Sequence, residues 1–180
     1  MAEEFELDEE GFLSVAAEVE AGTDAIEVPV ELMTEYDGPA HAPAQSLYAQ
    51  VLGMGVSEKI KLALRGNRDA RMILIRDGAR LIRRFVLQNP RISDGEVIAI
   101  CRNRSADDEL LRRIADSREW MRNYQVRLAL ASNSKTPLAV AMKQVSSLQQ
   151  RDLEQLAKSK NVSQTVAAQA RRLLQAKGQH

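Results

Sequence analysis

The sequence predicts an all-α protein, and two observations support this fold class. Aromatic residues make up only 4% of the 180 residues, while Leu, Ala, Arg and Gln dominate the second half. Such a composition is typical of helices packed by aliphatic side chains rather than of sheets rich in Val, Thr and Tyr. Capping residues also precede segments whose apolar residues recur at helical spacing. The length allows one core of about 100 to 130 residues and a loosely ordered tail.

The first 44 residues are predicted to form an acidic arm. Fourteen acidic side chains precede the first base, Lys59, and all 25 Lys and Arg follow with the remaining 11 acids. The formal net charge of zero is therefore the sum of about −14 and +14. A stretch with Gly38, Pro39 and Pro43 closes the arm, because these residues do not continue a helix. We expect a partly disordered, flexible arm at 1–44 and a folded domain at 45–180.

One segment of the arm has a different pattern from the rest. Residues 26–32 alternate apolar and acidic side chains as a short strand does. Pro29 removes a backbone donor from the middle of this segment. We expect either an edge strand or an extended docking peptide here.

Consecutive short helices are predicted from residue 44 onward. The first group has helices near 44–52 and 57–65 and a longer one over 68–88, broken around Asp77 and Gly78. The second group covers 94–102, 106–117 and 120–131, and Ser93 with Glu96 fits a capping box at its start. Helices of the third group begin near Pro137, Gln149 and Ser163, where Pro137 follows a capping Thr136 and Ser163 can cap the last helix.

The second and third groups repeat at a constant distance. Their three helices begin 43 residues apart, at 94 and 137, 106 and 149, and 120 and 163. A period of 40 to 47 residues made of two or three helices is typical of HEAT and armadillo arrays. The residues from Ala44 onward resemble such a repeat domain, and Asn89-Pro90-Arg91-Ile92, Arg118-Glu119-Trp120 and Thr136-Pro137-Leu138 resemble uncharacterised bacterial helical-repeat proteins.

This resemblance implies a short α-solenoid of about three HEAT/armadillo-like repeats, stacked with a right-handed sense. An irregular helical bundle is the alternative. Repeat consensus residues are structural, so the resemblance implies a fold without assigning an activity.

Motifs for catalysis or metal binding are missing from the sequence. His41 and His180 have no partner at ligand spacing, and no phosphate-cradling glycine motif occurs. The single cysteine, Cys101, lies in an apolar run and is predicted to be a core residue. Asp107 and Asp108 are expected to stabilise a helix N-terminus rather than to act as acid and base. We expect a protein that is not an enzyme and binds no cofactor or metal.

Three arginine doublets are the candidate binding residues. Each doublet is flanked by apolar residues, and on matching faces of stacked repeats the doublets would form a ridge for phosphates or carboxylates. Alternatively, their stems cover the edges of each apolar stripe. Trp120 is either a surface anchor or a plug between repeats. The candidate residues are Arg83, Arg84, Arg112, Arg113, Trp120, Arg171 and Arg172.

Two functions compete on this basis. In the first, the chain is an intracellular adaptor or regulatory scaffold that recognises a protein with an acidic surface or segment, and the arm docks on its own domain or on that partner. In the second, the basic face binds nucleic-acid backbone and the arm masks it. Few aromatic residues are available to stack on bases, which favours the first. No long apolar run or basic leader is present, so we expect a cytoplasmic protein without a membrane partner.

Overall fold

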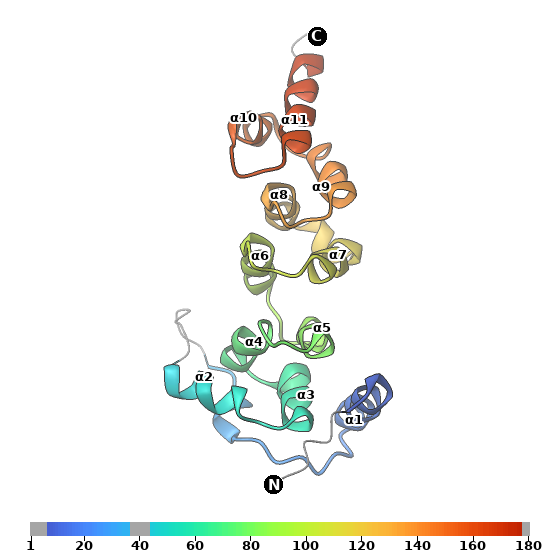
Figure 1. The fold of residues 1–180 in the computed structure, drawn as a ribbon, viewed down its shortest axis with the longest axis vertical. Coiled ribbons are helices and arrows are strands. Elements are labelled where there is room, and N and C mark those ends of the chain that lie inside the picture. The colour runs from blue at the N-terminus through green and yellow to red at the C-terminus, as the bar shows by residue number, and fades with distance from the viewer. Residues whose placement is uncertain (1–6, 37–43, 178–180) are drawn as a thin grey trace. The chain divides into compact units, whose positions relative to one another are not determined.

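A computed structural model describes residues 7–36 and 44–177 of the chain. These residues form eleven α-helices and two short 3-10 helices without any strand, which confirms the all-α prediction (Figure 1). The helices are α1 (Glu9–Ala21), η1 (Val30–Leu32), α2 (Gln45–Leu52), α3 (Val56–Arg65), α4 (Arg68–Leu74), α5 (Arg80–Gln88), α6 (Asp94–Arg102), α7 (Asp108–Asp116), η2 (Trp120–Arg122), α8 (Tyr124–Ser132), α9 (Leu138–Val145), α10 (Gln150–Lys158) and α11 (Gln164–Lys177).

The chain divides into two compact units, Met1–Ile92 (unit 1) and Ser93–His180 (unit 2). This division differs from the expected one, which separated an arm at 1–44 from a domain at 45–180. The reason is that residues 7–36 pack against the helices that follow them. The parts of the expected arm at 1–6 and 37–43 lie outside the described residues.

Unit 1 is built around α3. Helices α1 and α5 both contact α3, and α2 lies beside α4 (Figure 1). The core contains Val19 of α1, Leu32 of η1 and Ile60 of α3, each at most 1% exposed. The predicted break around Asp77 and Gly78 is confirmed, because α4 ends at Leu74 and the Asp77 carboxylate accepts a hydrogen bond from the Ala79 backbone N–H before α5 begins.

Helix α1 lies within the segment expected as an acidic arm. Asp8 caps its N-terminus by accepting a hydrogen bond from the Gly11 N–H at 2.9 Å. Gly22 ends it with φ of 72°, a left-handed conformation that favours glycine. Between these caps, Ala16 and Val19 are buried in unit 1. The apolar face of α1 therefore belongs to the core of unit 1.

Residues 24–36, which we call the acidic strap, are held mainly through their backbone. The Asn67 amide donates to the carbonyls of Glu31 (2.6 Å) and Thr34 (3.0 Å). Lys61 Nζ donates to the Ile26 carbonyl and to the Asp24 carboxylate at 2.6 Å. The hydrogen bond from Lys61 lowers the pKa of Asp24. Of the two alternatives for residues 26–32, the docked peptide fits these contacts and the edge strand is wrong.

The C-terminal end of the strap contacts a buried arginine. Arg71 is 2% exposed and its guanidinium donates to Glu35 Oε2 at 3.1 Å and to the Gly66 carbonyl. Arg91 lies 3.8 Å from the same carboxylate oxygen. A buried guanidinium is costly unless it is paired and hydrogen-bonded. Glu35 therefore fixes the end of the strap on α4.

The described residues of unit 2 form six α-helices and η2. Figure 1 shows α6, α8 and α10 along one side of this unit and α7, α9 and α11 along the other. Helix α6 contacts α8, α8 contacts α9, and α10 contacts α11. The predicted capping box is confirmed, because the Ser93 N–H donates to Glu96 Oε2 and the Glu96 N–H donates to Ser93 Oγ. Ser163 also caps α11, accepting from the Val166 N–H at 3.2 Å.

Two predicted helix boundaries differ from the observed ones. The helix expected over 120–131 divides into η2 and α8, because Asn123 adopts extended backbone and caps a new helix by accepting from the Gln125 N–H. Helix α9 begins at Leu138 rather than at Pro137, and Pro137 itself is the extended residue before it. Local patterns placed these helices within a few residues but missed the new cap.

Two buried asparagines connect helices in the same way in the two units. Asn89 follows α5 and donates to the carbonyls of Ala63 and Gly66 at the end of α3. Asn133 follows α8 and donates to the carbonyls of Cys101 (2.7 Å) and Asn103 (2.9 Å) at the end of α6. Each amide satisfies two helix-end carbonyls that have no partner within their own helix.

We predict that Asn133→Ala lowers the free energy of unfolding by about 2 to 4 kcal/mol, because two carbonyls lose a buried donor. Asn89→Ala should have an effect of similar size. Urea denaturation measures both, and Asn161→Ala, in an exposed loop, is the matched control. A loss below about 1 kcal/mol for Asn133→Ala would contradict the bridging role.

Candidate interaction surface

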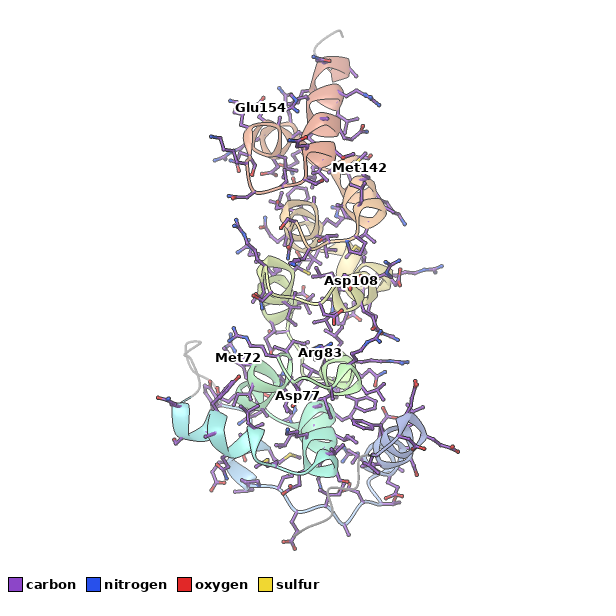
Figure 2. The ribbon with its side chains drawn as sticks, in the orientation of Figure 1. Met72, Asp77, Arg83, Asp108, Met142 and Glu154 are labelled. Carbon is purple, nitrogen blue, oxygen red and sulfur yellow. The ribbon has the colours of Figure 1, made fainter. Side chains whose placement is uncertain are left out.

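The arginine doublet of α5 is engaged with its own unit. Arg83 Nη1 donates to the carbonyls of Asp77 (2.5 Å) and Gly78 (3.0 Å), the turn that precedes the helix (Figure 2). Arg84 is half-buried, and its Nε is shielded from solvent without a hydrogen-bond acceptor. Arg83 therefore stabilises the α4–α5 turn.

The doublet of α7 is divided between two roles. Arg112 is exposed and has no ion pair with any described residue. Arg113 is half-buried, with its Nε 3.8 Å from Glu109 Oε1 one helical turn earlier. The Asp107 carboxylate caps α7 by accepting from the Glu109 N–H, and Asp108 follows in the first turn. These positions agree with the expected helix-dipole role of the two aspartates.

Both arginines of the α11 doublet are exposed. Arg171 Nη1 also donates to the Ala157 carbonyl at 2.9 Å, near the C-terminal end of α10. The three doublets do not occupy equivalent helices, since α7 is the second helix after Ser93 whereas α5 and α11 each end a group of three.

Trp120 lies in η2, between α7 and α8. It is half-buried, and its backbone N–H donates to Ser117 Oγ at 3.4 Å. The 3-10 helix that contains it contacts both neighbouring helices. Its position joins α7 to α8 while leaving part of the indole accessible.

The two units carry opposite net charges. Residues 93–180 contain 15 Lys and Arg against 9 Asp and Glu, and residues 1–92 contain 10 against 16, so the net charges are +6 and −6. The excess of bases in unit 2 lies mainly after Glu119, where 10 bases accompany two acids, Asp152 and Glu154.

The last three helices of unit 2 expose these bases, and we call the set the C-terminal basic surface. Seven of its Lys and Arg side chains are exposed, and none has an ion pair with a described residue. Arg171 of α11 donates to the carbonyl of Ala157, the residue before Lys158 in α10. The surface comprises Lys135, Lys143, Arg151, Lys158, Lys160, Arg171 and Arg172.

Few carboxylates are available to neutralise this surface. Asp152 is half-buried and accepts a short hydrogen bond from the Tyr124 hydroxyl, which also accepts from the Gln149 N–H. Burial, followed by the hydrogen bond to Asp152, raises the pKa of Tyr124. Glu154 is exposed on α10 (Figure 2). One exposed carboxylate therefore accompanies seven exposed bases between residues 133 and 176.

Cys101 is fully buried in unit 2, which confirms its prediction as a core residue. Burial raises the pKa of its thiol to about 12, so the thiolate that would act as a nucleophile is disfavoured. No group of three or more potential metal-binding side chains gathers within 7–36 and 44–177. His41 and His180 lie outside these residues. In the same ranges, no helix has the length and apolar character needed to cross a membrane.

Comparison with known proteins gives no relative: no protein-family model, curated protein or solved structure matches the chain.

The sequence contained a sign of the C-terminal basic surface that the doublets obscured. Lys135 and Lys143 are single bases in otherwise uncharged segments, and a doublet search passes over them. Counting acids as well as bases finds the C-terminal basic surface directly, because the 61 residues after Glu119 contain 10 bases and only two acids.

The α7 doublet gives a test of its two roles. We predict that Arg113→Ala lowers the melting temperature by about 2 to 4 °C, because it removes a half-buried side chain and its ion pair with Glu109. Arg112→Ala should change it by less than about 1 °C, since this side chain is exposed and has no ion pair with a described residue. Calorimetry on both variants measures the difference. Equal losses for the two would contradict the assignment.

The raised pKa of the Cys101 thiol leads to a prediction about stability at high pH. Its folded pKa of about 12 exceeds its ordinary value of 9.0, so its stabilising contribution is complete below pH 9.0 and is lost as pH rises toward 12. The loss is about 1.4 kcal/mol per pH unit over this range. Urea unfolding of the native chain and of Cys101→Ala isolates the loss due to Cys101. Both proteins retain the tyrosines, so ionisation of the tyrosines affects the two equally. Identical pH dependence above pH 9 would contradict the prediction.

Proposed function

We propose that the protein is a non-catalytic adaptor or regulatory scaffold whose C-terminal basic surface binds an acidic segment of a partner protein. The observation that supports this proposal is the seven exposed bases of α9–α11 and the preceding loop, accompanied by one exposed acid. Like charges at this density repel one another, and a partner with carboxylates relieves the repulsion. Arginine guanidinium groups also suit bidentate binding of carboxylates.

The alternative is a protein that binds nucleic-acid backbone through the same bases. The shortage of carboxylates on the surface favours this alternative, because phosphate binding needs positive charge without sequence readout. Stacking of aromatic side chains on nucleic-acid bases is less well supported, because Tyr124 is hydrogen-bonded to Asp152 and Trp120 is half-buried. In this alternative the acidic N-terminal residues mask a basic face. The strap's ion pairs to Lys61 and Arg71 show acidic residues covering bases within unit 1.

For the fold, we propose three armadillo-like repeats of three helices each: α3–α5, α6–α8 and α9–α11. In each group the first helix contacts the third. The bridges from Asn89 and Asn133 support equivalent positions for the first two groups. This register begins one helix later than the sequence suggested, because α4 and α5 are separate helices. We also place the protein in the cytoplasm, where the buried and unpaired Cys101 suits a reducing environment.

Binding of an acidic peptide tests the proposed function. A fluorescent polyglutamate peptide of about 20 residues should bind the full chain at low salt and weaken about tenfold or more in a base-neutral variant. That variant replaces three bases: Arg151→Gln, Lys158→Gln and Arg172→Gln. The matched control removes three exposed bases outside the surface: Arg104→Gln, Arg118→Gln and Arg122→Gln.

The control should retain its affinity within about threefold, since its bases lie elsewhere on unit 2. Equal weakening in both variants would contradict a localised surface. A duplex DNA of about 20 base pairs provides the comparison: binding of DNA with a steep salt dependence, without binding of the peptide, would overturn the adaptor proposal in favour of the alternative.

A further inference from the structure

Unit 1 presents an acidic surface of its own. Helix α1, the strap and the residue before α1 carry eight exposed carboxylates, and no base occurs before Lys59. Apart from Glu35, none of these carboxylates pairs with a Lys or Arg among the described residues. We call the other seven the N-terminal acidic surface: Asp8, Glu9, Glu10, Glu18, Glu20, Glu27 and Glu31.

The contacts of unit 1 leave this acidic surface unsatisfied. Two other carboxylates of the same region, Asp24 and Glu35, are those that pair with Lys61 and Arg71. The last turn of α1 contains no base, although Glu18 and Glu20 lie near that end. Acidic side chains near a helix C-terminus are unfavourable, because they add to the negative end of the helix dipole. A cationic partner would relieve this repulsion.

We propose that this partner is a second copy of the chain, whose C-terminal basic surface binds the N-terminal acidic surface. The proposal rests on the proposed function, because it uses the same basic surface and names its acidic partner. The sets match in number and sign: the N-terminal acidic surface has seven carboxylates and the C-terminal basic surface has seven bases. The net charges of −6 and +6 are equal and opposite.

Each charged surface also exposes a large apolar side chain, and the acidic surface exposes a second one, Val30, next to Glu31. Leu13 of α1 is 46% exposed, between Glu10 and Glu18 in the sequence. Leu138, at the start of α9, is 48% exposed and follows Lys135 by three residues. An apolar contact surrounded by charge pairs is the usual composition of a protein interface. The two leucines provide this contact where charge pairs alone are weak.

The geometry of such an association is head-to-tail. The two surfaces lie on different units, so each copy offers one patch of each sign. Such contacts close into a reciprocal dimer or a larger ring, or extend into an open chain, according to the rotation between neighbouring copies. Because the contact is mainly between exposed charges, it weakens as salt shortens the Debye length to about 4 Å near 0.5 M.

Sedimentation velocity of the full chain tests the proposal with two neutralised variants. The acid-neutral variant replaces three carboxylates of α1 (Glu10→Gln, Glu18→Gln, Glu20→Gln), and the base-neutral variant is the one defined above. The native chain should form species larger than a monomer at about 0.02 M salt and monomers at about 0.5 M salt. Each variant alone should remain monomeric, because it lacks one of the two surfaces.

An equimolar mixture of the two variants is the decisive sample. One intact acidic surface and one intact basic surface remain in it, so the mixture should form a 1:1 dimer that grows no further. A control that removes three carboxylates of unit 2 (Asp108→Asn, Asp116→Asn, Glu119→Gln) should associate as the native chain does, and matching melting temperatures verify that all variants fold.

A monomeric native chain at low salt, or a mixture that stays monomeric, would overturn the head-to-tail proposal. The polyglutamate experiment separates this failure from that of the proposed function. If the peptide binds the basic surface while the chain stays monomeric, the function stands and the acidic partner is another protein. If neither occurs, both proposals fail.

Discussion

The structure depends on contacts that join its helices to one another, because each helix is too short to be stable alone. The described α-helices range from 7 residues in α4 to 14 in α11, and isolated helices of this length are marginal in water. Each must bury its apolar stripe against neighbours, and its end carbonyls must find donors. Buried asparagines supply these donors: Asn89 and Asn133 each bridge to an earlier helix, and Asn67 bridges to the strap.

The same requirement determines which charged residues remain available for binding. Arg83 donates to carbonyls at the α4–α5 turn, and Arg71 is buried against Glu35. Such contacts occupy part of the basic excess seen in the sequence. In unit 2 the excess of bases over acids lies after Glu119. A plain count of arginines therefore overestimates the binding surface in α5 and underestimates it in α9 and α10.

Local sequence patterns predicted local structure well. The capping box at Ser93 and Glu96, the break around Gly78 and the burial of Cys101 all depend on neighbours within a few residues. The packing of the acidic residues was missed, because it depends on contacts between residues far apart in sequence. Asn67 lies 36 residues from Glu31, and nothing in its local sequence indicates that its amide binds the strap.

For the candidate site, the sequence established the charge excess but not its position. Doublets attracted attention because they are visible by eye, yet pairing places one arginine of the α7 doublet against the protein. Exposure decides which bases are available, and exposure follows from packing. The seven bases of the C-terminal basic surface could be found in the sequence by their lack of nearby acids, whereas the opposite surface on α1 required knowledge that residues 7–36 are folded.

The central claim is that the exposed bases of α9–α11 are unpaired and form the surface that meets an acidic partner. An NMR titration of the isotope-labelled full chain with polyglutamate, at low salt, tests it most directly. The account predicts amide shifts concentrated at Lys143, Arg151, Lys158 and Arg172, with little change in α5. Shifts spread evenly over both units, or centred on Arg83 and Arg84, would contradict it.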